Sequence, residues 1–191
     1  PDSAAVGLHL SLTWSPAAGS QGLGALLLRS HLRRLSPTAL ETRLCDQLHR
    51  FETLLGRPPE FVDGHQHVHA FPTIAPVLLA VLSQRYGESR PAVRSIRSGA
   101  WRGGKAGLLN RLGGNALHRR LQRDGWPANH DFAGVYPFDQ SQSYADRMRD
   151  WLRTLGDGGL IMCHPGSADL PEHGQARAEE SRYLASSAWL Q

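Results

Sequence analysis

The sequence predicts an α/β fold with a mainly parallel sheet, and two observations support this prediction. Apolar stretches of strand length alternate with amphipathic stretches of helix length along the 191 residues, a pattern typical of parallel sheets covered by helices. Three strand-like stretches, "GLHL", "DGHQHVHAFP" and "CHPG", carry histidine, and functional side chains in such folds gather where strands end. The length is that of one ordinary domain, so we expect residues 1–191 to form a single domain.

The beginning of the chain contains the signals of a strand, a loop and a long helix, in that order. Every second residue of "VGLHLSL" is apolar, which predicts a strand within residues 4–13. The breaker-rich stretch "WSPAAGSQGLG", residues 14–24, predicts a loop. A helix is expected over residues 37–55, because Ser36 can cap it and apolar residues recur at helical spacing.

The remaining elements follow from the same patterns. Short apolar stretches predict strands at residues 60–63, 92–98 and 160–166. Longer amphipathic stretches predict helices at residues 73–86, 105–125, 143–159 and 175–191. We expect the helix at 105–125 to be interrupted at Gly113 and Gly114, since glycine is a poor helix former.

Composition and charge exclude several classes of protein. The net charge of +4 comes from 21 basic and 17 acidic residues that are scattered along the chain, so a mixed, solvated surface is favoured over a nucleic-acid site. No apolar run approaches the roughly 20 residues that a membrane span needs. Two cysteines far apart give no disulfide framework, which favours a reducing compartment such as the cytoplasm. We expect Cys163 to be buried and inert, because it points away from its neighbour His164 in a strand.

The alternating polar residues Asp63, His65, His67 and His69 are the strongest chemical signal in the sequence. In an extended strand they would lie on one face. Neighbours two apart would be about 6.6 Å from each other, and His65 and His69 about 13 Å. Because a metal–nitrogen bond is only about 2.1 Å long, one or two of these residues could bind an ion, and the others would orient substrate or support the ligands.

Two further histidines are open to more than one interpretation. His9 lies on an apolar strand and is either a hydrogen-bonded core histidine or part of a site. His164 lies in "CHPG", where a turn without chemical function is as good an explanation as a catalytic one. Serine-nucleophile, phosphate-loop and dinucleotide-binding motifs are absent from the sequence.

Four stretches taken together, "VGLHLSLT", "VDGHQHVHAFP", "AVRSIRS" and "IMCHPG", resemble the YdjC-like carbohydrate deacetylases, the family of chitooligosaccharide deacetylase and the hopanoid-biosynthesis deacetylases. The resemblance extends over roughly residues 5–185. It implies a distorted (β/α) barrel of the polysaccharide-deacetylase type. It also implies a divalent-metal-dependent amidohydrolase that removes acetyl from an N-acetylated sugar or glycolipid.

The resemblance implies a role for individual residues. His9 and His65 would be the two metal histidines, and His164 would protonate the leaving amine or stabilise the oxyanion. Residues implied to bind the substrate, line the pocket or support the ligands are Asp63, His67, His69, Arg94 and Arg97. The ligand types suit Zn²⁺ or Mg²⁺, and Mn²⁺, Co²⁺ and Ni²⁺ stay open.

The sequence departs from the family at one important feature. The family's first strand ends in adjacent aspartates that supply the metal carboxylate and the general base, but the sequence contains no Asp-Asp pair. We therefore expect the first βα unit to lie outside residues 1–191 and do not expect these residues to be active by themselves. A phosphoesterase and a non-catalytic carbohydrate-binding relative remain alternatives, and a homodimer is left open.

Overall fold

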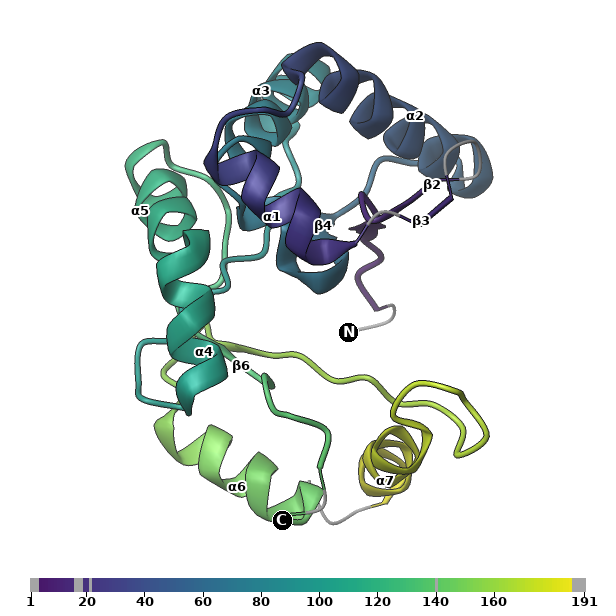
Figure 1. The fold of residues 1–191 in the computed structure, drawn as a ribbon, viewed down its shortest axis with the longest axis vertical. Helices are drawn as coiled ribbons and strands as arrows, with labels where there is room; N and C mark the ends of the chain where they lie inside the picture. Colours follow the sequence, from purple (N-terminus) through teal and green to yellow (C-terminus); the bar gives the residue numbers. More distant parts are fainter. Residues whose placement is uncertain (1–3, 16–18, 21, 140, 187–191) are drawn as a thin grey trace. The chain divides into compact units, whose positions relative to one another are not determined.

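The computed structural model describes residues 4–15, 19–20, 22–139 and 141–186. They form two compact units (Figure 1). Unit 1 consists of residues 1–96 and 110–128, and unit 2 consists of residues 97–109 and 129–191. The expectation of a single domain stays a prediction.

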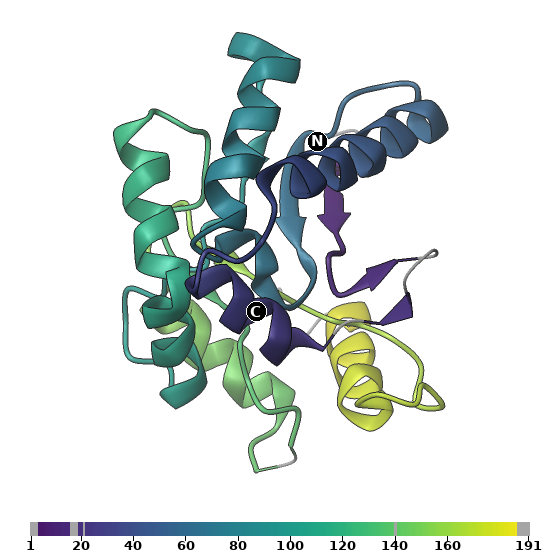
Figure 2. The ribbon, with the colours of Figure 1, turned by 45° about the horizontal axis from the view of Figure 1, so that its top comes forward.

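Unit 1 contains a parallel sheet of three strands in the order β1-β4-β5. The strands are β1 (Leu8–Leu10), β4 (Phe61–Gly64) and β5 (Ala92–Val93), and β1 and β4 lie side by side in Figure 2. The register places His9 opposite Asp63. The α/β class with parallel pairing is therefore confirmed, whereas the barrel stays a prediction.

The helices of unit 1 follow the sequence pattern closely. Helix α2 (Pro37–Leu55) has the predicted bounds, and Ser36 Oγ accepts the Ala39 N–H at its first turn. It packs against α3 (Ile74–Tyr86) (Figure 1), which is followed by a short 3₁₀ turn, η2 (Gly87–Ser89). The α2 side chains buried in this interface and the sheet are Leu40, Leu44 and Leu48, and full burial of one leucine contributes about 1.5–3 kcal/mol.

The predicted loop at residues 14–24 is wrong. Strands β2 (Trp14–Ser15) and β3 (Gly19–Ser20) pair antiparallel within it, and α1 (Leu23–His31) begins before it ends. Two-residue strands are too short to show a period of two in the sequence. Helix α1 was not predicted, and its N-cap, Gly22, provides no capping side chain that would mark its start.

The interrupted helix at residues 105–125 is confirmed. It consists of α4 (Gly104–Leu109), a π turn, η3 (Asn110–Gly114), and α5 (Asn115–Arg123). Gly113 has φ +148°, and a β-carbon there would lie 2.1 Å from the carbonyl oxygen of Ala70. The break therefore lets two backbone segments approach closely, which requires glycine.

Unit 2 contains a second parallel pair, β6 (Phe132–Ala133) with β7 (Leu160–Ile161). The strands predicted at residues 160–166 and 92–98 are shorter than expected, because only the first two residues of each form a strand. Strand β6 was not predicted. The expected helices are present as α6 (Tyr144–Thr154), capped by Ser143, and α7 (Gly174–Ala185). The end of the second predicted helix, residues 187–191, lies outside the described residues.

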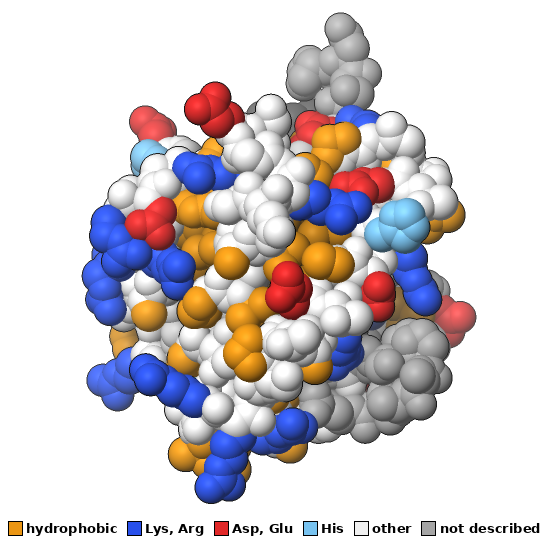
Figure 3. All heavy atoms as spheres, turned by 90° about the horizontal axis from the view of Figure 1, so that it is seen from above, with side chains coloured by type: hydrophobic (Ala, Val, Ile, Leu, Met, Phe, Trp, Pro, Cys, Tyr) orange, Lys and Arg blue, Asp and Glu red, His pale blue; other side chains and the backbone are white. Residues whose placement is uncertain are grey.

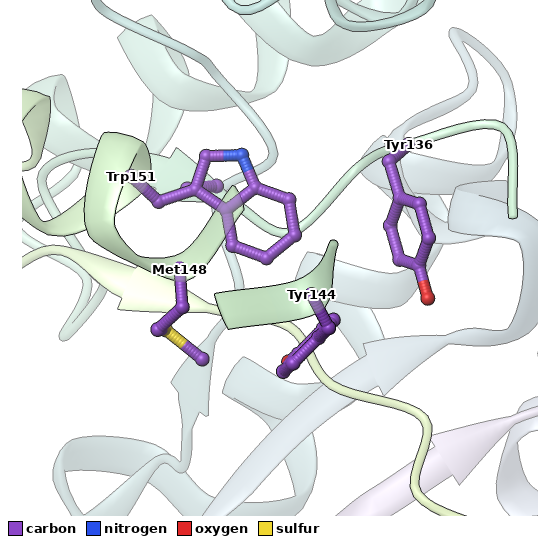
Figure 4. Close-up of a cluster of buried hydrophobic side chains, with 5 residues drawn as sticks. Tyr136, Tyr144, Met148 and Trp151 are labelled. Carbon is purple, nitrogen blue, oxygen red and sulfur yellow. The ribbon is translucent and has the colours of Figure 1, made fainter. Parts of the chain in front are cut away.

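The core of unit 2 is largely aromatic. Figure 4 shows Tyr136, Tyr144, Met148 and Trp151, which together with Ala133 form a buried cluster. The Trp151 ring lies 5.9 Å from the ring of Tyr136 and 5.9 Å from that of Tyr144, centroid to centroid. Aromatic pairs at such distances contribute about 0.5–1.5 kcal/mol beyond the area they bury.

Charges of both signs are mixed on the face of the protein shown in Figure 3. On the face of the described residues shown in Figure 3, Lys and Arg side chains lie in separate groups with apolar, uncharged and acidic side chains between them. None of the helices formed by the described residues combines the length and apolar character of a bilayer-spanning segment.

Candidate functional site

The histidine-rich segment folds as a turn and does not continue the strand. Strand β4 ends at Gly64, and η1 (His65–Ala70) follows as a 3₁₀ helix in which Gln66 and His67 have φ of +52° and +61°. The prediction that the three histidines alternate along one strand face is therefore wrong, and the extended separation estimated for His65 and His69 does not apply.

Burial of His69 explains the turn. Its side chain is 0% exposed, and its Nε2 lies 2.9 Å from the Arg94 carbonyl oxygen. Because a carbonyl only accepts hydrogen bonds, Nε2 carries the proton. A β-carbon at position 64 would lie 2.9 Å from His69 Nδ1, so Gly64 provides the space into which the ring folds back. Burial, and then the charge of Arg94, lower the pKa of His69 to about 3, so the ring is neutral.

Asp63 lies between a histidine and an arginine. Its Oδ1 is 2.6 Å from His9 Nδ1, and its Oδ2 is 2.7 Å from Arg94 Nη1. Burial favours the neutral acid, but the hydrogen bond to His9 and the charge of Arg94 outweigh it and lower the pKa of Asp63. An ionised carboxylate can only accept, so His9 Nδ1 donates, and Nε2 of the neutral ring is left with the lone pair. The side chain of His9 is 56% exposed, so it reaches the surface while Asp63 stays beneath it.

Arg94 supports the end of β4 from inside unit 1. Its side chain is only 7% exposed, and its guanidinium donates to the Gly64 carbonyl oxygen at 3.1 Å and to His67 Nδ1 at 3.3 Å. Burial lowers its pKa and the charge of Asp63 opposes this. The structure thus places Arg94 as an internal partner of Asp63 and His67, beneath the surface on which it was expected to bind a sugar or an anion.

His9 and His65 lie next to each other, with ring centroids 5.6 Å apart and planes at 81°. Two imidazoles that share one tetrahedral ion would have centroids about 5 Å apart, given a metal–nitrogen bond of about 2.1 Å. The pair therefore fits two positions of a metal site. Within the part of the chain that the structure describes, no group of three His, Cys, Asp or Glu residues is placed to hold an ion.

The other two predicted site residues, Arg97 and His164, belong to unit 2. His164 is half-buried just after β7, its ring meets Phe138 edge-on at 5.3 Å, and its backbone N–H donates to Glu180 Oε2. Arg97 is also half-buried. The neighbouring Cys163 was expected to be buried within a strand, but it lies beyond the end of β7 and is half-buried, and it accepts a hydrogen bond from the Tyr144 hydroxyl at 3.1 Å. Burial raises the pKa of Cys163, which keeps it a thiol, as expected for an inert cysteine.

Sequence reasoning missed two residues next to His164. Phe138 has φ +60° and stacks on the His173 ring at 4.5 Å, and no pattern in the sequence singles it out. Glu180 is 0% exposed on α7. It follows the buried Ala176 by four residues, so an acidic residue within the buried stripe of a helix was the available signal.

The fold and the site define an α/β protein in which His9 on β1, bonded to Asp63 of the neighbouring parallel strand β4, lies beside His65. The family model of the YdjC-like proteins matches residues 1–191, and the chain belongs to this family.

Curated relatives carry related names. A carbohydrate deacetylase of Mus musculus is 50% identical over 58 residues, which are 29% of this chain and 18% of that protein. A chitooligosaccharide deacetylase of Serratia marcescens is 37% identical over 84 residues, covering 39% of this chain and 33% of the relative. A carbohydrate deacetylase of Geobacillus stearothermophilus is 30% identical over 152 residues, covering 76% of this chain and 50% of the relative. The chain thus spans half or less of the length of these relatives.

A crystal structure from Enterococcus faecalis V583, of a protein provisionally assigned to cellobiose-phosphate cleavage, has a similar fold. Its TM-score is 0.66 at 18% sequence identity, over 97% of this chain and 71% of that chain. At this identity the likeness concerns the fold alone.

Proposed function

We propose that the chain forms part of a divalent-metal-dependent carbohydrate deacetylase, which hydrolyses the amide bond of an N-acetylated sugar or glycolipid. The observation that carries the proposal is the chain of contacts from Arg94 through Asp63 to His9, with His65 beside it. Carboxylate-supported histidines are typical of metal sites. The names of the family relatives support the substrate class.

His9 and His65 would hold the ion, and Zn²⁺ or Mg²⁺ is expected, with Mn²⁺, Co²⁺ and Ni²⁺ compatible. When bound, the ion would polarise the acetyl carbonyl and acidify a water molecule. Asp63 accepts the hydrogen bond that His9 Nδ1 donates, which keeps the proton on Nδ1 and leaves the lone pair of Nε2 as the ligand. Arg94 favours the ionised form of Asp63, which this orientation requires.

The remaining histidines would act on the substrate or support those that do. Arg94 donates to His67 Nδ1, which leaves the proton of the neutral ring on Nε2, where it can donate to a substrate oxygen. His69 would fix the turn from inside. His164 would protonate the leaving amine, and Arg97 would bind a substrate oxygen. The general base is expected to come from an aspartate outside this set of residues.

The test is metal content together with acetate release. Elemental analysis is made on the chain as printed and on a form preceded by a strand that carries adjacent aspartates. His9→Ala and His65→Ala should each abolish stoichiometric metal in the longer form, and Asp63→Asn should weaken metal binding by about 10–100-fold. His49→Ala, an exposed histidine of α2, is the matched control and should bind metal as the parent does.

Activity is followed as acetate released from chitooligosaccharides, with phosphate released from sugar phosphates measured in parallel. Acetate release that disappears in His9→Ala and His65→Ala supports the proposal. Unchanged metal content and acetate release in both variants would refute it, and phosphate release without acetate release would favour a phosphoesterase.

A further inference from the structure

Glu180 is a fully buried carboxylate in unit 2. It lies on α7, its exposure is 0%, and α7 packs against α6. A buried acidic group is stabilising only when donors satisfy it, and an apolar residue of similar size would usually stabilise the fold as well or better. The presence of an acid at this position therefore requires an explanation beyond packing.

Both carboxylate oxygens of Glu180 accept a hydrogen bond from a different segment. Oε2 accepts the backbone N–H of His164, and Oε1 accepts the hydroxyl of Tyr136. Burial raises the pKa of Glu180, and these two hydrogen bonds act in the opposite direction. The carboxylate thus joins α7 to the segments that follow β7 and β6.

Helix α7 also fixes the rest of the turn at His164. Arg177 Nε donates to the His164 carbonyl oxygen at 3.2 Å, so both backbone polar groups of His164 are bonded to α7. Two residues further on, Gly166 N–H donates to Ser181 Oγ at 2.8 Å, and the Ser181 hydroxyl bonds the Gly166 carbonyl oxygen at 2.9 Å. The two residues flanking Pro165 are therefore both held by side chains of one helix.

We infer that Glu180 is the positioning residue of His164. Its carboxylate fixes the His164 backbone and thereby the direction in which the imidazole side chain points. The inference rests on the proposed function, in which His164 protonates the leaving amine. A misplacement of about 1 Å in such a group can reduce the rate by about 100-fold, so a fixed backbone at this position has a direct consequence for turnover.

The sequence allows the His164 amide to be observed alone. The chain has two cysteines, Cys45 and Cys163, and only the second is followed by histidine. Isotope labelling of cysteine carbonyl carbons and histidine amide nitrogens therefore gives a single carbonyl-to-amide correlation in an NMR spectrum of the full chain. In the parent protein this amide proton should resonate far downfield and exchange slowly with solvent, because it donates to a buried carboxylate.

The test variant is Glu180→Gln, and Glu179→Gln is its matched control. Glu179 Oε1 accepts the Tyr144 backbone N–H at 2.8 Å, a bond that a glutamine carbonyl oxygen can replace. At position 180 the glutamine NH₂ must face either the His164 N–H, which can only donate, or the Tyr136 hydroxyl, which would have to turn and accept, so in both arrangements the His164 amide loses its charged acceptor. We expect the His164 amide to move upfield in Glu180→Gln and to stay in place in Glu179→Gln. In the longer form that carries the adjacent aspartates, the kcat of acetate release should fall by about 100-fold in Glu180→Gln alone, with KM little changed.

The outcomes separate the two proposals. An unchanged amide position in folded Glu180→Gln would overturn the inference, as would unchanged kcat despite a shifted amide. Fast solvent exchange of this amide in the parent protein would overturn it without any variant. Absence of acetate release from the longer form that carries the adjacent aspartates would instead overturn the proposed function, and the spectrum would still decide whether Glu180 fixes His164.

Discussion

Replacement of Arg94 by methionine is the sharpest test of the arrangement around Asp63. The guanidinium is 2.7 Å from Asp63 Oδ2, and the two side chains are 7% and 11% exposed. Removing one member of a buried ion pair costs about 3–5 kcal/mol, because the other charge is left uncompensated. His9 still bonds Asp63 in the variant, so we expect Arg94→Met to lower the free energy of unfolding by about 3 kcal/mol, the low end of this range.

The assay is urea unfolding at neutral pH, followed by circular dichroism. The control is Arg57→Met, which removes an exposed pair with Glu60 whose side chains are 48% and 46% exposed. Such pairs contribute about 0–1 kcal/mol, so this variant should unfold close to the parent.

A double variant tests whether the lower free energy of unfolding in Arg94→Met comes from the uncompensated charge of Asp63. Asp63→Asn combined with Arg94→Met removes both charges, so its loss should be smaller than the sum of the two single losses, by about 1 kcal/mol or more. Strict additivity would refute the reasoning, and so would an Arg94→Met loss no larger than that of Arg57→Met.

Two further predictions concern the same unit. The lowered pKa of Asp63 means that its ionised form stabilises the fold above the ordinary carboxyl pKa, and this stability is lost as the pH falls through the folded-state pKa. The difference in unfolding free energy between the parent and Arg94→Met should therefore shrink on acidification, as measured by urea unfolding across the acidic range. A difference that is independent of pH would contradict this prediction. Gly113→Ala places a β-carbon 2.1 Å from the Ala70 carbonyl oxygen at φ +148° and should lower the free energy of unfolding by at least about 2 kcal/mol. The control is Gly104→Ala, whose β-carbon meets nothing within 4 Å and which should melt at the temperature of the parent or above it. Equal melting temperatures of the two variants would contradict the close approach at Gly113.

The features that local sequence determines were predictable, and α2 shows why. Its capping serine, its leucine spacing and the glycine after Leu55 all lie within the segment, so its bounds could be predicted correctly. Strand β6 has only two residues, and its existence depends on pairing with β7, nearly thirty residues later in the chain. A pairing partner so distant leaves no periodic signal in a two-residue strand.

The candidate site was predictable in its residue types but not in its contacts. The sequence singled out His9, Asp63 and His65, yet the bond between His9 and Asp63 joins residues 54 positions apart. It follows from the parallel register of β1 and β4, which no single segment specifies. Arg94 was expected to bind the substrate, and its role as a buried partner of Asp63 could be identified only from the fold.

The three histidines of "HQHVH" show how one repeated residue type is divided among three environments. An alternating pattern suggests equivalent positions on a strand, but the left-handed backbone at Gln66 and His67 ends that equivalence. His65 is left beside His9, His67 receives a hydrogen bond from Arg94, and His69 is enclosed completely. Enclosing His69 is what brings the turn back over Gly64, and the same arginine that bonds His67 also pairs with Asp63. The orientation of His9 and His65 therefore depends on buried side chains that no ligand would contact. For this reason we expect substitutions of these buried side chains to affect metal binding as well as stability.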